Sequence, residues 1–214
     1  MLPAQRGFFS LPSKQLAANS FSLRNLLVTL GKMAFLEDQL GEWKPVSRGA
    51  GIAWLVFYVL FLLYAFLDRS GFLILDYVNL MIHEGGHFFF SWFGETIHIL
   101  GGTLGELIAP LLCAFYFFWQ RETTGFAFSI FWFFENFPYI GTYMADARTA
   151  SLPLVSSDES DWTILFGQWG LLQQDQKIGH AMHVLGWLGM LAIVAWLGYR
   201  IRESASTKPK PLAW

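Results

Sequence analysis

Residues 51–67 read GIAWLVFYVLFLLYAFL, an unbroken apolar run that ends at Asp68 and Arg69. A helix needs roughly 20 mostly apolar residues to cross the hydrocarbon core of a bilayer. Together with Ala50, this run is long enough, so we expect it to form a membrane-spanning helix. The run therefore predicts an integral membrane protein.

The composition of the whole chain favours the same interpretation. Its 214 residues are 54% hydrophobic and 14% charged, whereas soluble domains carry about 25% charged residues. The net charge of −2 gives no basis for a nucleic-acid-binding surface. A single cysteine, Cys113, excludes an internal disulfide and a multi-cysteine zinc knuckle.

Four more apolar stretches follow, at about residues 71–93, 97–119, 125–143 and 182–197. A shorter one, at 162–172, is a candidate for a sixth passage. We therefore expect an all-α, polytopic transmembrane helix bundle with four to six membrane segments. Because Gly101, Gly102 and Glu106 interrupt the stretch at 97–119, we expect a re-entrant loop or hairpin around residues 97–106.

Basic residues gather at the two ends of the chain, before position 50 and after position 199. Loops rich in Lys and Arg stay in the cytoplasm, so we expect both tails there, in a plasma membrane such as the bacterial inner membrane. Residues 1–48 form the N-terminal tail, in which 21–36 is either an interfacial helix or part of a flexible segment. Residues 49–199 form the bundle, and we expect a disordered tail over 200–214.

The stretch at 71–93 carries the motif with the clearest chemistry. Residues 76–94 read DYVNLMIHEGGHFFFSWFG, which contains the pattern H-E-x-x-H at His83, Glu84 and His87. Residues four apart lie on one face of a helix, so both imidazoles can share one Zn²⁺ ion while Glu84 acts as general base on a bound water. About 0.005 chance matches are expected in a chain of this composition. In the expected orientation this site sits toward the cytoplasmic half of the bilayer.

The HEGGH motif within a membrane stretch, followed by a later helix with an acidic residue, resembles the site-2-protease family of intramembrane zinc metalloproteases and bacterial membrane proteins related to it. The third zinc ligand of that family is an Asp in the pattern N-x-x-P-x-x-x-L-D-G. Residues 135–148 read ENFPYIGTYMADAR, with Asn136, Pro138 and Asp146 at a different spacing and without the L-D-G ending. The resemblance implies Asp146 as the third ligand.

The residues themselves leave the third ligand open. Straight, parallel helices would place Glu135 near the level of His83, whereas a kink at Pro138 would return Asp146 toward the metal. Asp161 and Glu159, in the loop that follows, are further candidates.

Three polar residues outside the motif are weaker candidates. Asp76 lies two turns before His83 and could orient an imidazole. Glu106 belongs either to the lining of the site or to a solvated turn. His98 has no partner nearby in the sequence.

The function that these residues favour is that of a membrane-embedded zinc metallopeptidase, with the lipid bilayer and a peptide or membrane-protein substrate as partners. The alternative is a non-proteolytic membrane protein that binds metal or handles protons or ions and retains a zincin-like site.

Overall fold

The computed structural model describes residues 41–153 and 159–206. The chain divides into two compact units, residues 1–42 and 43–214, and the fold below is that of the second. The expected interfacial helix at 21–36 and the end of the C-terminal tail lie outside the described residues. The described part contains helices and no strands, which confirms the all-α prediction: α2 (Arg48–Leu67), α3 (Asp76–Phe90), η1 (Ser91–Phe93), α4 (Glu95–Trp119), α5 (Thr123–Ala145), α6 (Asp161–Trp169), η2 (Leu172–Gln174) and α7 (Asp175–Ser206).

The apolar run at residues 51–67 lies within α2. Ser47 begins the helix, because its hydroxyl accepts a hydrogen bond from the Ala50 amide, 3.3 Å away. The helix ends at Leu67, and the carboxylate of Asp68 accepts hydrogen bonds from the Ser70 hydroxyl and the Gly71 amide that follow it. Most of its apolar side chains are exposed, as expected of a helix that faces lipid.

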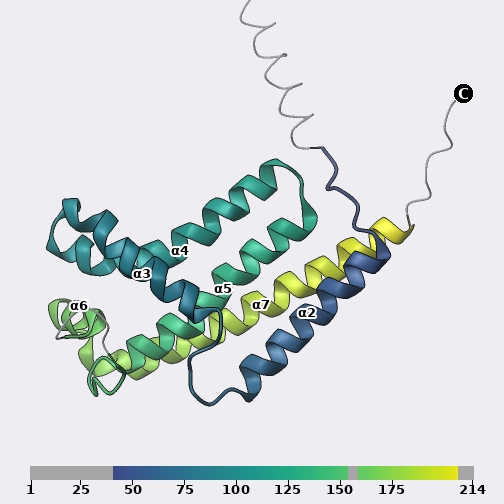
Figure 1. The fold of residues 1–214 in the computed structure, drawn as a ribbon. Helices are drawn as coiled ribbons and strands as arrows, with labels where there is room; N and C mark the ends of the chain where they lie inside the picture. The colour runs from purple at the N-terminus through teal and green to yellow at the C-terminus, as the bar shows by residue number, and fades with distance from the viewer. Residues whose placement is uncertain (1–40, 154–158, 207–214) are drawn as a thin grey trace, which may run out of the picture. The chain divides into compact units, whose positions relative to one another are not determined.

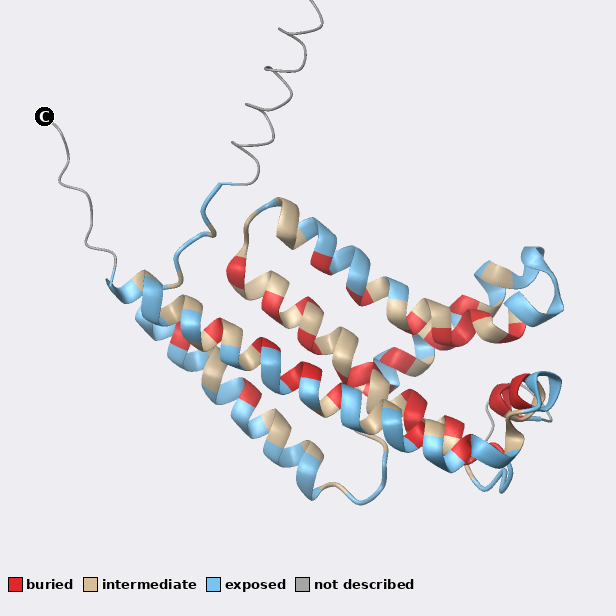
Figure 2. Ribbon diagram, turned by 180° about the vertical axis from the view of Figure 1, so that it is seen from behind, coloured by how far each residue is buried: buried red, intermediate tan, exposed pale blue. Residues whose placement is uncertain are grey.

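Three helical segments of the described residues are long and apolar enough to cross a membrane: α2, α4 and Leu172–Ser206, which comprises η2 and α7. In Figure 1, α5 lies between α4 and α7, α2 lies along α7, and α3 packs on α4. Buried residues concentrate on α5 and on the faces turned toward it, while exposed residues cover the outside of α2 (Figure 2). The helix α5 is therefore the centre of the bundle.

The break expected around residues 97–106 lies instead at Ser91–Gly94, where η1 and a glycine with φ of 93° reverse the chain. Residues 97–106 belong to the continuous helix α4. Its glycines are contact residues, since a Cβ built on Gly86 of α3 would lie only 2.2 Å from the Gly101 carbonyl oxygen. Close packing of the two helices outweighs the low helix propensity of glycine.

Two other boundaries differ from the predictions. The helix α7 continues through residues 200–206, which were expected to be disordered, and an ion pair between Arg200 and Glu203 lies on that last turn. The segment considered for a sixth passage forms α6, whose nine residues span only about 14 Å. The hydrocarbon core is about 30 Å thick, so α6 is too short to cross it.

Candidate metal centre

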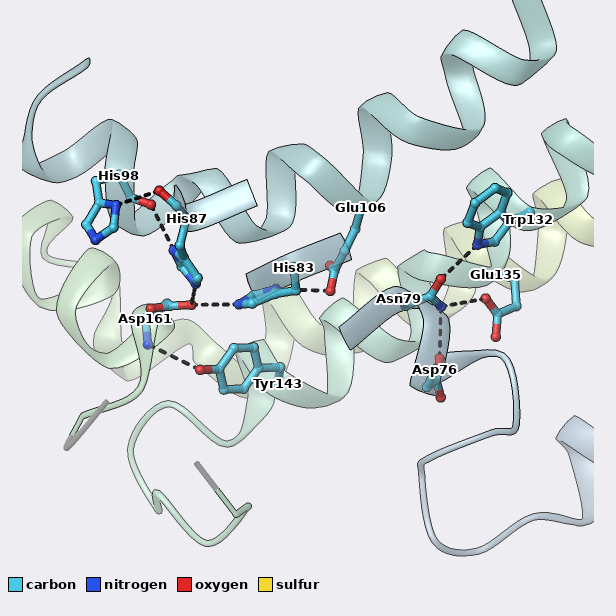
Figure 3. A network of polar contacts seen from close by, with 10 residues as sticks. All are labelled: Asp76, Asn79, His83, His87, His98, Glu106, Trp132, Glu135, Tyr143 and Asp161. Atoms are coloured by element: carbon cyan, nitrogen blue, oxygen red, sulfur yellow. Dashed lines mark hydrogen bonds and ion pairs between the residues drawn. The ribbon is translucent and has the colours of Figure 1, made fainter. Parts of the chain in front are cut away.

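Two histidines of α3 and one aspartate of α6 converge on a single point (Figure 3). His83 and His87 lie on the same face of α3, with ring centroids 4.7 Å apart. The Nε2 atoms of His83 and His87 lie 3.0 and 3.1 Å from the same Asp161 oxygen, Oδ2. In the described part of the chain, these are the three residues whose donor atoms meet closely enough to hold a metal ion.

Hydrogen bonds on the far side of each ring set the histidine tautomers. The Nδ1 atom of His83 lies 3.0 Å from Oε1 of Glu106, and Nδ1 of His87 lies 2.9 Å from the His98 carbonyl oxygen. These oxygens accept from Nδ1, which leaves Nε2 of each ring, the atom that faces Asp161, as the one available to a metal ion. Oxygens that bond a ligating imidazole in this way orient the ring and raise its basicity.

His98, which had no partner in the sequence, has one in the structure. Its own Nδ1 donates to the His87 carbonyl oxygen over 2.8 Å, so the two histidines exchange ring-to-backbone hydrogen bonds. The exchange joins the end of α3 to the start of α4 across the η1 turn. It also satisfies a carbonyl in the last turn of α3, where helices leave such groups unpaired.

Asp161 is the first residue of α6 and directly follows the N-cap residue, Ser160. Its backbone amide donates to the hydroxyl of Tyr143 at 3.4 Å. Burial raises the pKa of the Asp161 carboxyl, but hydrogen bonds with His83 and His87 outweigh burial and lower the pKa overall. The group is therefore ionised, the form in which a carboxylate binds a metal ion.

The structure does not bring Asp146 to the histidines. Pro138 is accommodated within α5, and the helix runs on to Ala145 instead of folding back. Asp146 follows as the C-terminal cap, where its carboxylate accepts hydrogen bonds from Thr149, Ser151 and the Leu152 amide. We therefore transfer the assignment of the third ligand from Asp146 to Asp161.

Asp76 and Glu135 belong to a second, separate polar cluster (Figure 3). The side-chain amide of Asn79 donates to Asp76 at 3.1 Å and to Glu135 at 3.0 Å. Its oxygen accepts from the Trp132 indole at 2.7 Å, which uses every hydrogen-bonding group of the amide. Glu135 thus lies at the level of Asn79, one helical turn before His83 in α3. Asp76 contacts Asn79 and neither imidazole.

A cavity of about 590 Å³ opens beside the two histidines and Asp161, and Glu84 and Glu159 also line it. Cavities of this size accommodate small molecules or a few side chains of a peptide. Tyr139 and Tyr143 contribute aromatic walls. The half-buried Glu84 therefore shares one accessible space with the three candidate ligands.

A glycine in α4 makes room for the first histidine. A Cβ built on Gly102 would lie 2.4 Å from Nε2 of His83, so any larger residue would displace the ring. Gly85, next to Glu84, is different, because a Cβ there would meet no atom within 4 Å. Gly102 is thus part of the site, whereas Gly85 faces open space.

The donor set fits a divalent transition metal. The separations of 3.0 and 3.1 Å between nitrogen and oxygen are close to the edge of a zinc tetrahedron, about 3.3 Å for bonds near 2 Å. Two neutral imidazoles and one carboxylate also leave at least one coordination position for water, as in catalytic zinc sites. The chain matches no model of a known protein family, no curated protein and no solved structure.

Proposed function

We propose that this chain is a membrane zinc metallopeptidase. The observation that carries the proposal is the convergence of His83, His87 and Asp161 on one point, with Glu84 lining the same cavity. The resemblance of the HEGGH motif to the site-2-protease family supports the same reaction class. In this proposal Asp161 takes the place that the resemblance gives to Asp146.

Each residue has a defined task in peptide hydrolysis. A zinc ion at this site would polarise the scissile carbonyl and lower the pKa of its bound water. Glu84 would accept a proton from the attacking water and deliver it to the leaving amine. Glu106 and the His98 carbonyl would hold the two imidazoles in the ligating tautomer.

Changing Glu84 to Gln tests the proposal. We expect the purified variant to bind one zinc ion per chain, like the wild type, because the substitution leaves all three ligands in place. Cleavage of a mixed library of fluorescence-quenched peptides should fall by at least 10²-fold, the lower range for loss of a general base. Elemental analysis and peptide fluorescence measure the two quantities on the same sample.

Glu95→Gln is the matched control, since Glu95 is an exposed residue in the first turn of α4, and it should retain wild-type cleavage. The proposal fails if the zinc-loaded wild type cleaves no peptide. It also fails if Glu84→Gln cleaves at the wild-type rate, or if the purified protein holds iron instead of zinc, since two histidines and a carboxylate also form iron sites.

A further inference from the structure

The bundle contains a band without any Asp, Glu, Lys, Arg or His. The band comprises residues 49–67 of α2, 107–119 of α4, 123–134 of α5 and 184–199 of α7. At 1.5 Å per residue its α2 segment is about 28 Å long, close to the thickness of the hydrocarbon core. Every Asp, Glu, Lys, Arg and His of these four helices lies before or after the band.

Contacts between the helices show that the four segments lie at the same level. Gly51, near the start of α2, faces Ile201, near the end of α7. Phe66, near the end of α2, contacts Trp187 with ring centroids 6.5 Å apart. At that same level Gly186 of α7 lies against Phe134 and Pro138 of α5, where the charge-free part of α5 ends, and Gly125 at the start of α5 lies against Phe117 of α4. The charge-free segments thus form one layer across the bundle and not a set of staggered patches.

The outer surface of this layer is apolar. Large hydrophobic side chains on α2, α4 and α7 are exposed there, among them Ile52, Leu60, Leu112, Phe115, Leu188 and Leu191. The charge-free segments of α4, α5 and α7 are shorter, about 20, 18 and 24 Å, but a layer of exposed apolar side chains of this kind is typical of a surface covered by lipid. The layer therefore marks the membrane.

The metal centre lies beyond one edge of the layer. Glu106, which holds His83, immediately precedes the charge-free part of α4. Asp161 lies on the short helix α6, and the aromatic turn η1 lies at the same end of the bundle (Figure 1). The site is thus near one edge of the layer and not at its middle.

The charges at the two ends differ in sign. The end that holds the start of α2, the α4–α5 turn and the end of α7 carries Lys44, Arg48, Arg121, Arg200 and Arg202. Two acidic residues lie there as well, Glu122 paired with Lys44 and Glu203 paired with Arg200, so the basic residues are in excess. The segments of this end are in contact, since the Val46 amide donates to Ser204 and the Lys44 amide to the Arg121 carbonyl. In the described ranges, the end with the metal centre carries more acidic than basic residues. Its basic residues are Arg69, Arg148 and Lys177, and Arg148 pairs with Asp175.

We propose that the metal centre faces the non-cytoplasmic side of the membrane and acts on peptide segments at that surface. The positive-inside rule places the basic end in the cytoplasm, and the acidic end with the site then lies on the opposite face. This reverses the placement in the cytoplasmic half that the apolar stretches alone predicted. The choice of substrate rests on the proposed peptidase function, whereas the orientation does not.

Two single-cysteine variants in a Cys113→Ser background test the orientation. Glu95→Cys places a thiol at the end with the metal centre, and Ser206→Cys places one at the opposite end; both positions are exposed. In sealed right-side-out membrane vesicles, a membrane-impermeant maleimide should label Glu95→Cys at once and Ser206→Cys only after permeabilisation. Labelling of both variants in detergent verifies that each thiol is reactive. Any other pattern overturns the orientation.

The same vesicles test the substrate class. Quenched peptides added outside should be cleaved without permeabilisation, and vesicles with the Glu84→Gln variant should leave them intact. Cleavage that requires permeabilisation overturns the proposal that the site works on the outer surface. If labelling shows the expected orientation but no peptide is cleaved on either side, the peptidase function fails while the orientation stands.

Discussion

The two imidazoles of the HEGGH motif depend on partners far from it in sequence. The spacing of His83 and His87 predicts a shared face and Glu84 beside it, and the structure places all three around one cavity. The partner oxygens come from α4, which packs antiparallel to α3 (Figure 1). No spacing rule links Glu106 to His83, so its role could be suspected from its unusual place in an apolar stretch but not assigned.

The candidate third ligand, Asp161, could not be predicted from spacing either, because it is even farther away in the sequence. Asp161 stands 78 positions after His83 and looks like an ordinary helix start beside Ser160. The family pattern favoured Asp146, but the carboxylate of Asp146 is used by the loop that follows α5. Only the folded position of α6 brings Asp161 to the histidines.

Glu106→Gln should weaken metal binding by about 10- to 100-fold, the usual effect of losing a partner of a ligating histidine. The neutral amide can still accept the His83 Nδ1 hydrogen but no longer supplies the negative charge that raises ligand basicity. Competition with a chromogenic zinc chelator measures the affinity. Glu95→Gln, on the same helix but exposed, serves as the control, and equal affinities for the two variants would contradict the role of Glu106.

At the scale of the element, the pair α3 and α4 holds the site together. Apolar stretches located both helices in the sequence to within a few residues at most ends, because burial in lipid requires long apolar segments. Their glycines suggested an interruption, since glycine is a poor helix former. The interruption does not occur, because Gly86, Gly101 and Gly102 allow the two backbones and the His83 ring to approach closely.

Gly102→Ala should therefore destabilise the protein by about 1–3 kcal/mol, the cost of overpacking a tight contact, and should lower metal affinity by displacing the His83 ring. Gly85→Ala is the matched control, because its Cβ would meet nothing within 4 Å and a helix interior gains about 0.5–1 kcal/mol from the change. Thermal unfolding in detergent micelles, with a metal titration on each variant, measures both effects. If Gly102→Ala behaves like Gly85→Ala, this glycine does not shape the site.

At the scale of the whole molecule, the distribution of charge was the most useful part of the sequence. The low charged fraction predicted a membrane bundle, and the structure contains three helical segments able to span one. The sequence could not predict which level each helix occupies, since that depends on contacts such as Phe66 with Trp187. Those contacts align the charge-free segments into one layer and leave the candidate metal centre near its edge.

The binding of one metal ion by His83, His87 and Asp161 is tested by the metal content per chain in purified Asp161→Asn and Asp146→Asn, because both substitutions replace a carboxylate with a neutral amide of the same shape. We predict one ion per chain in the wild type and in Asp146→Asn, and almost none in Asp161→Asn. Full occupancy in Asp161→Asn, loss of metal in Asp146→Asn, or a wild type without metal would show that Asp161 is not the third ligand of such a site.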